Sequence, residues 1–291
     1  MPTVAIIGTG NMGNPMAINL KKSGFDVRAY DLIETRMDNL VPLGIVKTAS
    51  HAAAIEAADF VLTMLPSGLE VEEVYRQQIL KYAKPEALLI DSSTIDTRES
   101  KEIHAAAKRA GFSSLDAPVS GGTVGAHNGA LSFMVGGEKE DLDRAMPLFE
   151  AMGKAVVHCG SGGLGQAAKM CNNMMLAIQM SSVAEGFKLA EKCGLSHAKL
   201  FEVATQSSGN CFALTTFCPV PDIVPTAPST SNYQPGFTAE LMLKDLTLAL
   251  NAAQDASLDL SSAKAVEPRY QELVEQGRSH LDFSAIYTNI E

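Results

Sequence analysis

The chain has 291 residues, 46% of them hydrophobic, which is enough to bury the core of one large domain or two ordinary ones. Its formal net charge of -10 argues against nucleic acid and against anionic membrane surfaces as partners. No run of about eighteen apolar residues predicts a membrane span, and no leader-like segment precedes the first predicted strand. The expected compartment is the cytoplasm, with a mature mitochondrial form as the alternative.

The segment from Val4 to Asp31 predicts a complete βαβ unit. Val4 to Ile7 is a short apolar run, as expected for a strand buried on both faces. Gly8, Gly10 and Gly13 follow as G-x-G-x-x-G, and a helical stretch then ends near residues 23–24. Residues 26–30 predict a second strand with Asp31 at its end. This combination is typical of dinucleotide binding.

Each part of this unit has an expected role. Gly8 permits a tight turn, Gly10 lets the backbone approach a pyrophosphate, and Gly13 lets helix and strand pack closely. Asp31 would accept hydrogen bonds from the adenosine ribose and repel a 2′-phosphate, so we expect NAD rather than NADP. The alternative is a purely structural turn in which Asp31 caps a strand. The agreement of strand, helix and acid favours the cofactor.

Strands and helices continue to alternate through the first half of the chain. Apolar runs predict strands at residues 60–64, 87–90, 112–115, 131–135 and 155–159, and helices are expected at 96–110 and 138–152. The pattern predicts an α/β Rossmann-type, doubly wound, mostly parallel sheet. Ligands bind beyond the carboxyl ends of such strands, so the loops 65–66, 92–94 and 120–122 should gather around one crevice.

Glycines at residues 160–165 interrupt this alternation and predict a hinge. Helices are expected at 166–193, 196–207, 239–256 and 262–275, with a long loop at 218–237. The fold prediction is therefore a cofactor domain over 1–163 and an all-α domain over 164–291 with a long central helix. That helix is apolar nearly all round, which predicts burial against other helices and another subunit, in a homodimer or homotetramer.

Two polar groups interrupt the predicted apolar and glycine-rich segments. Lys169 and Asn173 are four residues apart on one helix face; Lys169 could act on an alcohol proton while Asn173 orients the lysine or the substrate. The alternative is a lysine that reaches solvent and an asparagine that binds backbone, and the adjacent hinge favours function.

The turn Ser120–Gly122 offers a hydroxyl and two amides that could bind a carboxylate. The alternative is a plain structural turn.

The remaining polar residues carry weaker signals. Lys244 and Asp245, taken alone, predict a solvated pair. The five cysteines form no C-x-x-C pair, which predicts reduced and mostly buried thiols, with Cys171 in the core. The histidines show no H-x-x-H or H-E-x-x-H spacing, so no metal site is predicted.

Four motifs in order along the chain resemble those of the β-hydroxyacid dehydrogenases, and most closely the 3-hydroxyisobutyrate branch of that family. They are GTGNMGNPMAINLKKSGFDVRAYD, DAPVSGGTVGAHNGALSFMVGG, GLGQAAKMCNN, and PVPDIVPTAPSTSNYQPGF followed by LMLKDLTLA. Two positions depart from the pattern: Glu70 stands where a neutral residue is frequent, and Ser231 where asparagine is usual. These departures bear on the exact hydroxy acid.

The resemblance implies NAD-dependent oxidation of a small carboxylate substrate, 3-hydroxyisobutyrate, to methylmalonate semialdehyde in valine catabolism. It makes Lys169 the catalytic residue and implies substrate contacts from Ser120, Gly121, Gly122 and Asn173. The expected cofactor contacts are Gly8, Gly10, Asn11, Met12, Gly13, Asp31, Leu32, Leu65, Pro66, Glu70, Thr94 and Lys244.

Two alternatives to this function remain open. One is a semialdehyde reductase of the same family, acting on tartronate, succinic or glyoxylic substrates. Such enzymes often use NADPH, and Asp31 with no arginine directly after it speaks against that cofactor. The other is a non-catalytic dinucleotide-binding module, which would most simply lack Lys169.

Overall fold

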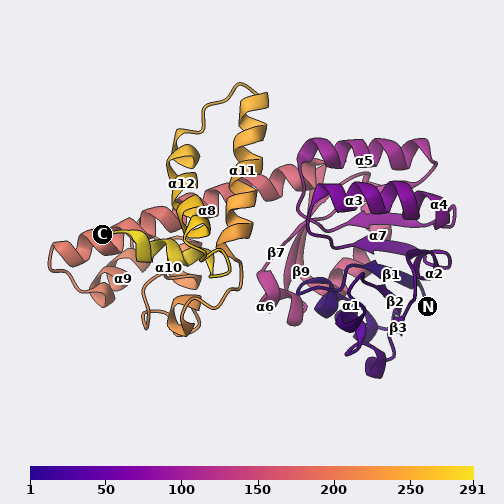
Figure 1. Ribbon diagram of the computed structural model, residues 1–291, viewed down its shortest axis with the longest axis horizontal. Coiled ribbons are helices and arrows are strands. Elements are labelled where there is room, and N and C mark those ends of the chain that lie inside the picture. The colour runs from indigo at the N-terminus through magenta and orange to yellow at the C-terminus, as the bar shows by residue number, and fades with distance from the viewer. The chain divides into compact units, whose positions relative to one another are not determined.

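A computed structural model describes all residues from 1 to 291, and the chain divides into two compact units, Met1–Lys169 and Met170–Glu291 (Figure 1). The division falls within the long helix α8 (Leu164–Lys192), close to the boundary predicted at residues 163 and 164. No helix is long and apolar enough to cross a membrane.

The first unit is built on a nine-stranded sheet in the order β3-β2-β1-β4-β5-β6-β8-β7, with β9 paired to β8. Along this order, each neighbouring pair from β3 through β2, β1, β4 and β5 to β6 is parallel. Strand β8 runs antiparallel to β6 and β7, and β9 is parallel to β8. The predicted mostly parallel, doubly wound sheet is therefore confirmed. The strands are β1 (Thr3–Ile7), β2 (Asp26–Tyr30), β3 (Val46–Lys47), β4 (Phe60–Thr63), β5 (Leu88–Asp91), β6 (Ser113–Asp116), β7 (Val119–Ser120), β8 (Leu131–Gly136) and β9 (Gly153–Gly160).

Helices cover both faces of this sheet because alternate strand residues point to opposite sides. Val4 and Ile6 belong to one apolar cluster with Met16 of α1, whereas Ala5 and Ile7 belong to another. The helices of this unit are α1 (Gly13–Lys22), α2 (His51–Ile55), α3 (Gly68–Val74), α4 (Leu80–Tyr82), α5 (Thr97–Arg109), α6 (Gly122–His127) and α7 (Lys139–Met152), with a π-helical turn η3 (Tyr75–Ile79) and the 3₁₀ turns η1 (Glu34–Met37) and η2 (Val41–Leu43).

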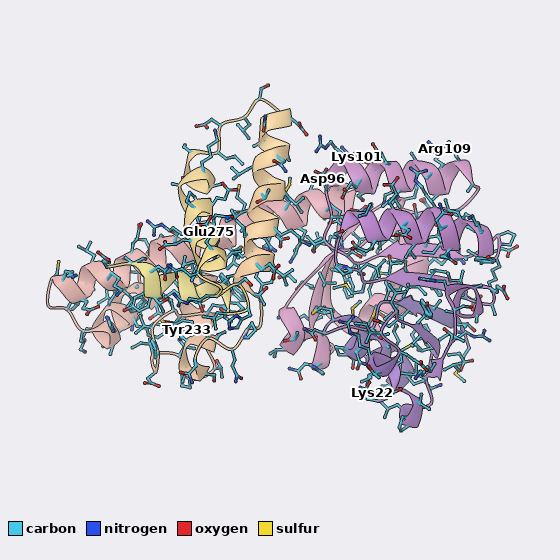
Figure 2. The ribbon with its side chains drawn as sticks, in the orientation of Figure 1. Lys22, Asp96, Lys101, Arg109, Tyr233 and Glu275 are labelled. Carbon is cyan, nitrogen blue, oxygen red and sulfur yellow. The ribbon has the colours of Figure 1, made fainter.

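Helix α5 shows how local sequence sets an element. Asp96 accepts a hydrogen bond from the Arg98 backbone N–H, and Glu99 accepts one from the Asp96 N–H, so a capping box begins the helix. Figure 2 shows Asp96 at the start of α5 and Arg109 at its end. The sequence did not indicate α6, a six-residue helix with two glycines, or the helical segment 68–82.

The second unit is entirely helical, as predicted. It comprises most of α8 together with α9 (His197–Thr205), α10 (Phe212–Thr216), α11 (Ala239–Asp255) and α12 (Ser261–Glu275), and the 3₁₀ turns η4 (Pro228–Ser231) and η5 (Phe283–Asn289). Phe187, Tyr270 and Phe283 are fully buried in its core. The predicted long loop at 218–237 contains only η4. The Tyr233 hydroxyl, labelled in Figure 2, donates to the carbonyl of Pro219 at 2.8 Å and pins this loop.

The cysteine prediction was partly wrong. Only Cys218 is fully buried, while Cys171 and Cys193 are exposed, so Cys171 is not a core residue. Burial raises the pKa of the Cys218 thiol to about 11. Helix α8 is not covered all round in the single chain, since Met175 is 55% and Leu189 66% exposed. An apolar sequence shows that a helix should be covered, but it does not show which side the same chain covers.

Candidate active site

The glycine turn after β1 has the geometry that only glycine tolerates. Gly8 has φ +93°, and its N–H donates to the carbonyl of Tyr30 at 2.9 Å. A Cβ on Gly13 would lie 2.0 Å from the Gly8 oxygen, so helix α1 can approach the strand only with glycine there. A Cβ on Gly10 would meet nothing within 4 Å, so this side of the turn is open. These features fit the pyrophosphate of a dinucleotide.

Asp31 is held beside this turn by the backbone. Its side chain is buried, Oδ2 accepts the Thr9 N–H at 2.7 Å, and Oδ1 accepts the Ile33 N–H at 2.8 Å. Leu32, a predicted contact, is 83% exposed. The sequence did not indicate Arg36, whose Nη1 lies 3.5 Å from Asp31 Oδ1 because η1 turns the chain back. The sequence signal that could have indicated this contact is an arginine five positions after Asp31.

A cavity of about 300 Å³ opens over the glycine turn. Asn19 helps to form it, because its Nδ2 donates to the Ala126 carbonyl at 2.7 Å and holds α6 against α1. His127 on α6 lines the same cavity as the glycine turn, a placement that the sequence did not indicate. The lining residues are Thr9, Gly10, Asn11, Asn14, Pro15, Arg36 and His127.

The loops after β4 and β5 are joined by a buried network. Ser93 Oγ accepts the Leu65 N–H at 2.9 Å and donates to Asp91 Oδ1 at 2.7 Å, and Thr63 Oγ1 also donates to Asp91 Oδ1 at 2.7 Å. Burial raises the pKa of the Asp91 carboxyl, more than these hydrogen bonds lower it. The structure thus brings together the segments of Leu65 and Thr94, two of the predicted cofactor contacts.

Other predicted cofactor contacts have local partners. The Ser67 hydroxyl donates to the Glu70 carboxylate at the start of α3, so Glu70 contributes to the beginning of that helix. Thr94 and Lys244 are half-buried. The structure contains no group of three or more histidine, cysteine, aspartate or glutamate side chains that could bind a metal ion.

The turn at Ser120–Gly122 leads directly into helix α6. Gly121 and Gly122 both have positive φ, +126° and +58°. A Cβ on Gly121 would lie 3.4 Å from Leu131 Cδ2 and 3.5 Å from Gly125 Cα, so it would point into the protein. A substitution there would strain the backbone rather than fill a ligand space, and Ser120 is the sharper probe of this turn.

The start of α8 is fixed by a buried carboxylate at the end of β6. Asp116 Oδ1 accepts the Gly163 N–H at 2.7 Å, and Oδ2 accepts the Gln166 N–H at 2.8 Å. A negative charge beside a helix N-terminus is favourable, and these bonds satisfy two of its free amides. Lys169, which is 8% exposed, follows Gln166 by three residues on this anchored segment.

Asn173 lies in the second unit and is only 2% exposed. Its Nδ2 donates to Asp245 Oδ2 of α11 at 2.5 Å, and its Oδ1 accepts from Asn172 Nδ2 at 3.0 Å. Asp245 is also 2% exposed, so the expectation of a solvated Lys244–Asp245 pair was wrong. The sequence missed this because Asp245 meets its partner from a segment 72 positions away.

Comparison with known proteins gives a consistent result for both halves of the chain. Residues 3–160 match the NAD binding domain of 6-phosphogluconate dehydrogenase, and residues 163–290 match a domain described as NAD-binding of NADP-dependent 3-hydroxyisobutyrate dehydrogenase. A probable 3-hydroxyisobutyrate dehydrogenase of Mycobacterium tuberculosis is 46% identical over 98% of this chain and 97% of the relative. The chain belongs to the 3-hydroxyisobutyrate dehydrogenase family.

Further members of this family agree over nearly the whole chain. The mitochondrial 3-hydroxyisobutyrate dehydrogenase of Mus musculus is 42% identical over 98% of this chain and 85% of its own length. An NAD-dependent L-serine dehydrogenase of Pseudomonas aeruginosa is also 42% identical, over 98% and 97%. The solved structure of M. tuberculosis 3-hydroxyisobutyrate dehydrogenase with L-serine superposes with a TM-score of 0.95, at 44% identity and 99% coverage of both chains.

Family membership establishes the class of chemistry. The chain is an oxidoreductase that acts on a CH–OH group with a nicotinamide dinucleotide as cofactor. The open glycine turn, the buried Asp31 carboxylate beside it and the cavity between α1 and α6 fit such a cofactor. The predicted resemblance is therefore confirmed at the level of the family.

Proposed function

We propose that this protein oxidises 3-hydroxyisobutyrate to methylmalonate semialdehyde with NAD. The observation that carries the proposal is identity of 40–46% to dehydrogenases named for this acid, over 98% of the chain. The buried Lys169 on an anchored helical turn supports it, because a proton-transferring group must be held in place. A module without catalytic activity would have no use for a lysine buried there.

Lys169 is the proposed acid–base residue. It accepts the proton of the substrate hydroxyl during oxidation, and its positive charge then stabilises the oxygen on which negative charge develops. The bound nicotinamide supplies the hydride acceptor. Asn173 is proposed to contact the substrate while Asp245 orients its amide. In the reverse direction Lys169 donates the proton.

The substrate carboxylate is proposed to bind the turn formed by Ser120, Gly121 and Gly122. The support is the pair of positive-φ glycines at the start of α6, Gly121 as its N-cap and Gly122 as its first residue, which leaves amide N–H groups there. The Ser120 hydroxyl adds a further donor. These hydrogen-bond donors are neutral and would contact only the carboxylate group. The turn would therefore suit any short carboxylic acid.

NAD is the proposed preferred form of the cofactor. The buried Asp31 carboxylate lies where the ribose hydroxyls are recognised and would repel a 2′-phosphate. Arg36, 3.5 Å from that carboxylate, partly offsets the repulsion. The proposed cofactor contacts otherwise remain Gly8, Gly10, Asn11, Met12, Gly13, Leu32, Leu65, Pro66, Glu70, Thr94 and Lys244.

L-serine is a second candidate substrate. One relative is named as an L-serine dehydrogenase, and one structural neighbour was solved with L-serine. L-serine also carries a hydroxymethyl group next to the carbon that bears its carboxylate. The Ser120–Gly122 turn and Lys169 would therefore serve both acids, and only the side group would distinguish them.

The proposed assembly is a homodimer or homotetramer formed through the helical unit. Large apolar side chains of this unit remain exposed in the single chain, among them Met175, Leu189 and Phe212. We propose that these side chains belong to one interface, because exposed apolar patches mark interaction sites.

The test is a kinetic panel with 3-hydroxyisobutyrate, L-serine and the unsubstituted 3-hydroxypropionate, each with NAD and with NADP. The reaction is followed by the absorbance of the reduced nicotinamide. We expect the highest kcat/KM with 3-hydroxyisobutyrate and NAD. A higher kcat/KM with L-serine would overturn the substrate assignment, and a lack of turnover with every acid would overturn the reaction.

A further inference from the structure

Gln166 is a buried polar residue that the proposed mechanism leaves without a role. It is 1% exposed, and both atoms of its amide are used by one loop. Its Nε2 donates to the Ser93 carbonyl at 2.7 Å, and its Oε1 accepts the Ile95 N–H at 3.2 Å. These two bonds bracket Thr94, a proposed cofactor contact.

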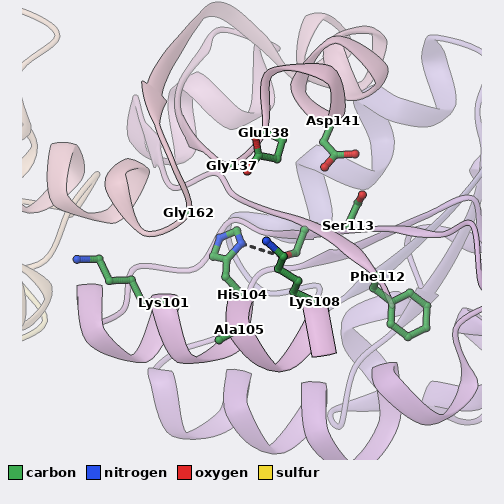
Figure 3. A pocket seen from close by; sticks show the side chains of 11 residues that line it. Lys101, His104, Ala105, Lys108, Phe112, Ser113, Gly137, Glu138, Asp141 and Gly162 are labelled. Carbon is green, nitrogen blue, oxygen red and sulfur yellow. Dashed lines mark hydrogen bonds between the residues drawn. The ribbon is translucent and has the colours of Figure 1, made fainter. Parts of the chain in front are cut away.

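The backbone of Gln166 is fixed from the opposite side. Its N–H donates to Asp116, and the same carboxylate accepts His104 Nε2 at 3.0 Å. Ser114 Oγ lies 2.7 Å from His104 Nδ1, so a second side chain orients the imidazole. Figure 3 shows His104 directed from α5 toward the loop that contains Gly162. The first turn of α8 is therefore tied to the ends of both β5 and β6.

This arrangement leaves Gln166 little freedom. A buried amide whose donor and acceptor are both satisfied loses those bonds if its rotamer or its helix shifts. Lys169 is three residues further along the helix, so a displacement of this turn carries the lysine with it. The Ser93 hydroxyl also accepts the Leu65 N–H, which extends the same network to a second proposed cofactor loop.

We propose that Gln166 is a positioning residue for hydride transfer, which fixes the turn that carries Lys169 to the loop that carries Thr94. The inference rests on the proposed function, since it takes Lys169 as the acid–base group. Its effect falls on the chemical step more than on binding, because the glycine turn and Asp31 are untouched. Misplacement of a reacting group by about 1 Å can cost roughly a hundredfold in rate.

The first variant is Gln166→Met, which keeps the length of the side chain and removes both bonds. We expect kcat to fall by ~10–100-fold, while the Kd for NAD changes by less than about threefold. Thermal unfolding followed by circular dichroism, which suits a chain without tryptophan, checks that the variant is folded.

The second variant, Gln166→Glu, gives a readout that a general loss of stability would not produce. An ionised carboxylate can accept the Ile95 N–H but would repel the Ser93 carbonyl, whereas the protonated acid can donate to that carbonyl and restore both bonds. The ratio of its kcat to that of the wild type should therefore rise as the pH falls. Gln77→Glu, at an exposed position of the same unit, is the matched control and should keep a constant ratio.

A pH-independent ratio for Gln166→Glu, or a Gln166→Met enzyme with wild-type kcat, would overturn the positioning role. If Lys169→Ala is inactive while the Gln166 variants behave normally, this inference fails and the proposed mechanism stands. If Lys169→Ala retains activity, the proposed mechanism itself fails. The two failures are thus distinguishable.

Discussion

Both units of the molecule bury polar side chains, but they use them differently. The first unit buries polar side chains where its strands end, such as Asp31, Asp91 and Asp116, and hydrogen bonds hold each of them. The second unit buries Asp245, which binds Asn173, and Asp282, which binds the backbone at Gly236 and Phe237. Both units leave large apolar side chains exposed, such as Leu69 in the first and Leu189 in the second. The buried carboxylates of the first unit lie beside the proposed ligand site, whereas those of the second unit hold helices and loops together.

One local motif occurs in both units and sharpens this contrast. Asp91 and Asp282 each accept the backbone N–H and the hydroxyl of the serine two positions later. In the first unit that serine also binds the Leu65 loop. In the second, the other Asp282 oxygen accepts the N–H groups of Gly236 and Phe237. The same turn thus joins two proposed cofactor loops in one unit and secures a structural loop in the other.

The largest expected effect comes from removing the proposed acid–base group of the first unit. Lys169→Ala should lower kcat by ~10²–10⁴, since a positioned acid–base group contributes about that factor. Lys169→Arg should not restore activity, because a guanidinium hardly gives up its proton. Steady-state kinetics and calorimetric NAD binding measure both, with exposed Lys192→Ala as the control. Near-normal kcat in Lys169→Ala would refute the mechanism.

The proposed interface of the second unit should be nearly as sensitive. Leu189→Glu places a charge on the exposed apolar side of α8, and burying it without a partner should weaken assembly by roughly a hundredfold. Light scattering over a concentration series measures the mass. Lys192→Glu changes an exposed polar position of the same helix and should leave the mass unchanged. A wild-type chain that is monomeric at micromolar concentration would refute the proposed interface.

Cofactor choice tests the carboxylate beside the glycine turn. Asp31→Ser should reduce the preference for NAD over NADP by about tenfold, because the charge that repels a 2′-phosphate is gone. Arg36→Ala should raise that preference, since Asp31 would lose its nearby positive charge. The measurement is kcat/KM with each cofactor. A wild type that already prefers NADP would contradict the role given to Asp31.

Substrate anchoring should show a smaller effect. Ser120→Ala removes one donor to the carboxylate and should raise KM for the acid by about fivefold, the value of one hydrogen bond. The KM for NAD should stay close to normal, because the glycine turn is unchanged. An unchanged KM for the acid would mean that the carboxylate binds elsewhere.

The smallest effect concerns stability in acid. Burial raises the pKa of Asp91 and of Asp282 above the usual 3.8, so the folded state binds protons more tightly than the unfolded chain. The free energy of unfolding should therefore decline as the pH rises from 3.8 through each folded-state pKa. Asp91→Asn and Asp282→Asn should each flatten part of this slope in urea unfolding. An unaltered slope in both variants would exclude these carboxyls as its source.

Local signals in the sequence predicted the βαβ unit, most strands and the helical second half. These signals are the spacing of Gly8, Gly10 and Gly13 and the apolar runs of the strands. Each of them involves only a few neighbouring residues. The anchors of the site were not predictable in this way. Gln166 binds Ser93 across 73 positions and Asp116 binds Gln166 across 50, contacts that no short pattern encodes. Arg36 was missed because a 3₁₀ turn, not a strand, brings it to Asp31.

Helix α8 continues without interruption through the point where the two units divide, and Lys169 is the last residue before that point. A recombination that joined two relatives directly after Lys169 would transfer the proposed acid–base residue together with the unit that contains the glycine turn. The incoming helical half would then supply its own Asn173 position and its own exterior. Such chimaeras would show which properties follow the first unit, with its Ser120–Gly122 turn, and which follow the helical unit.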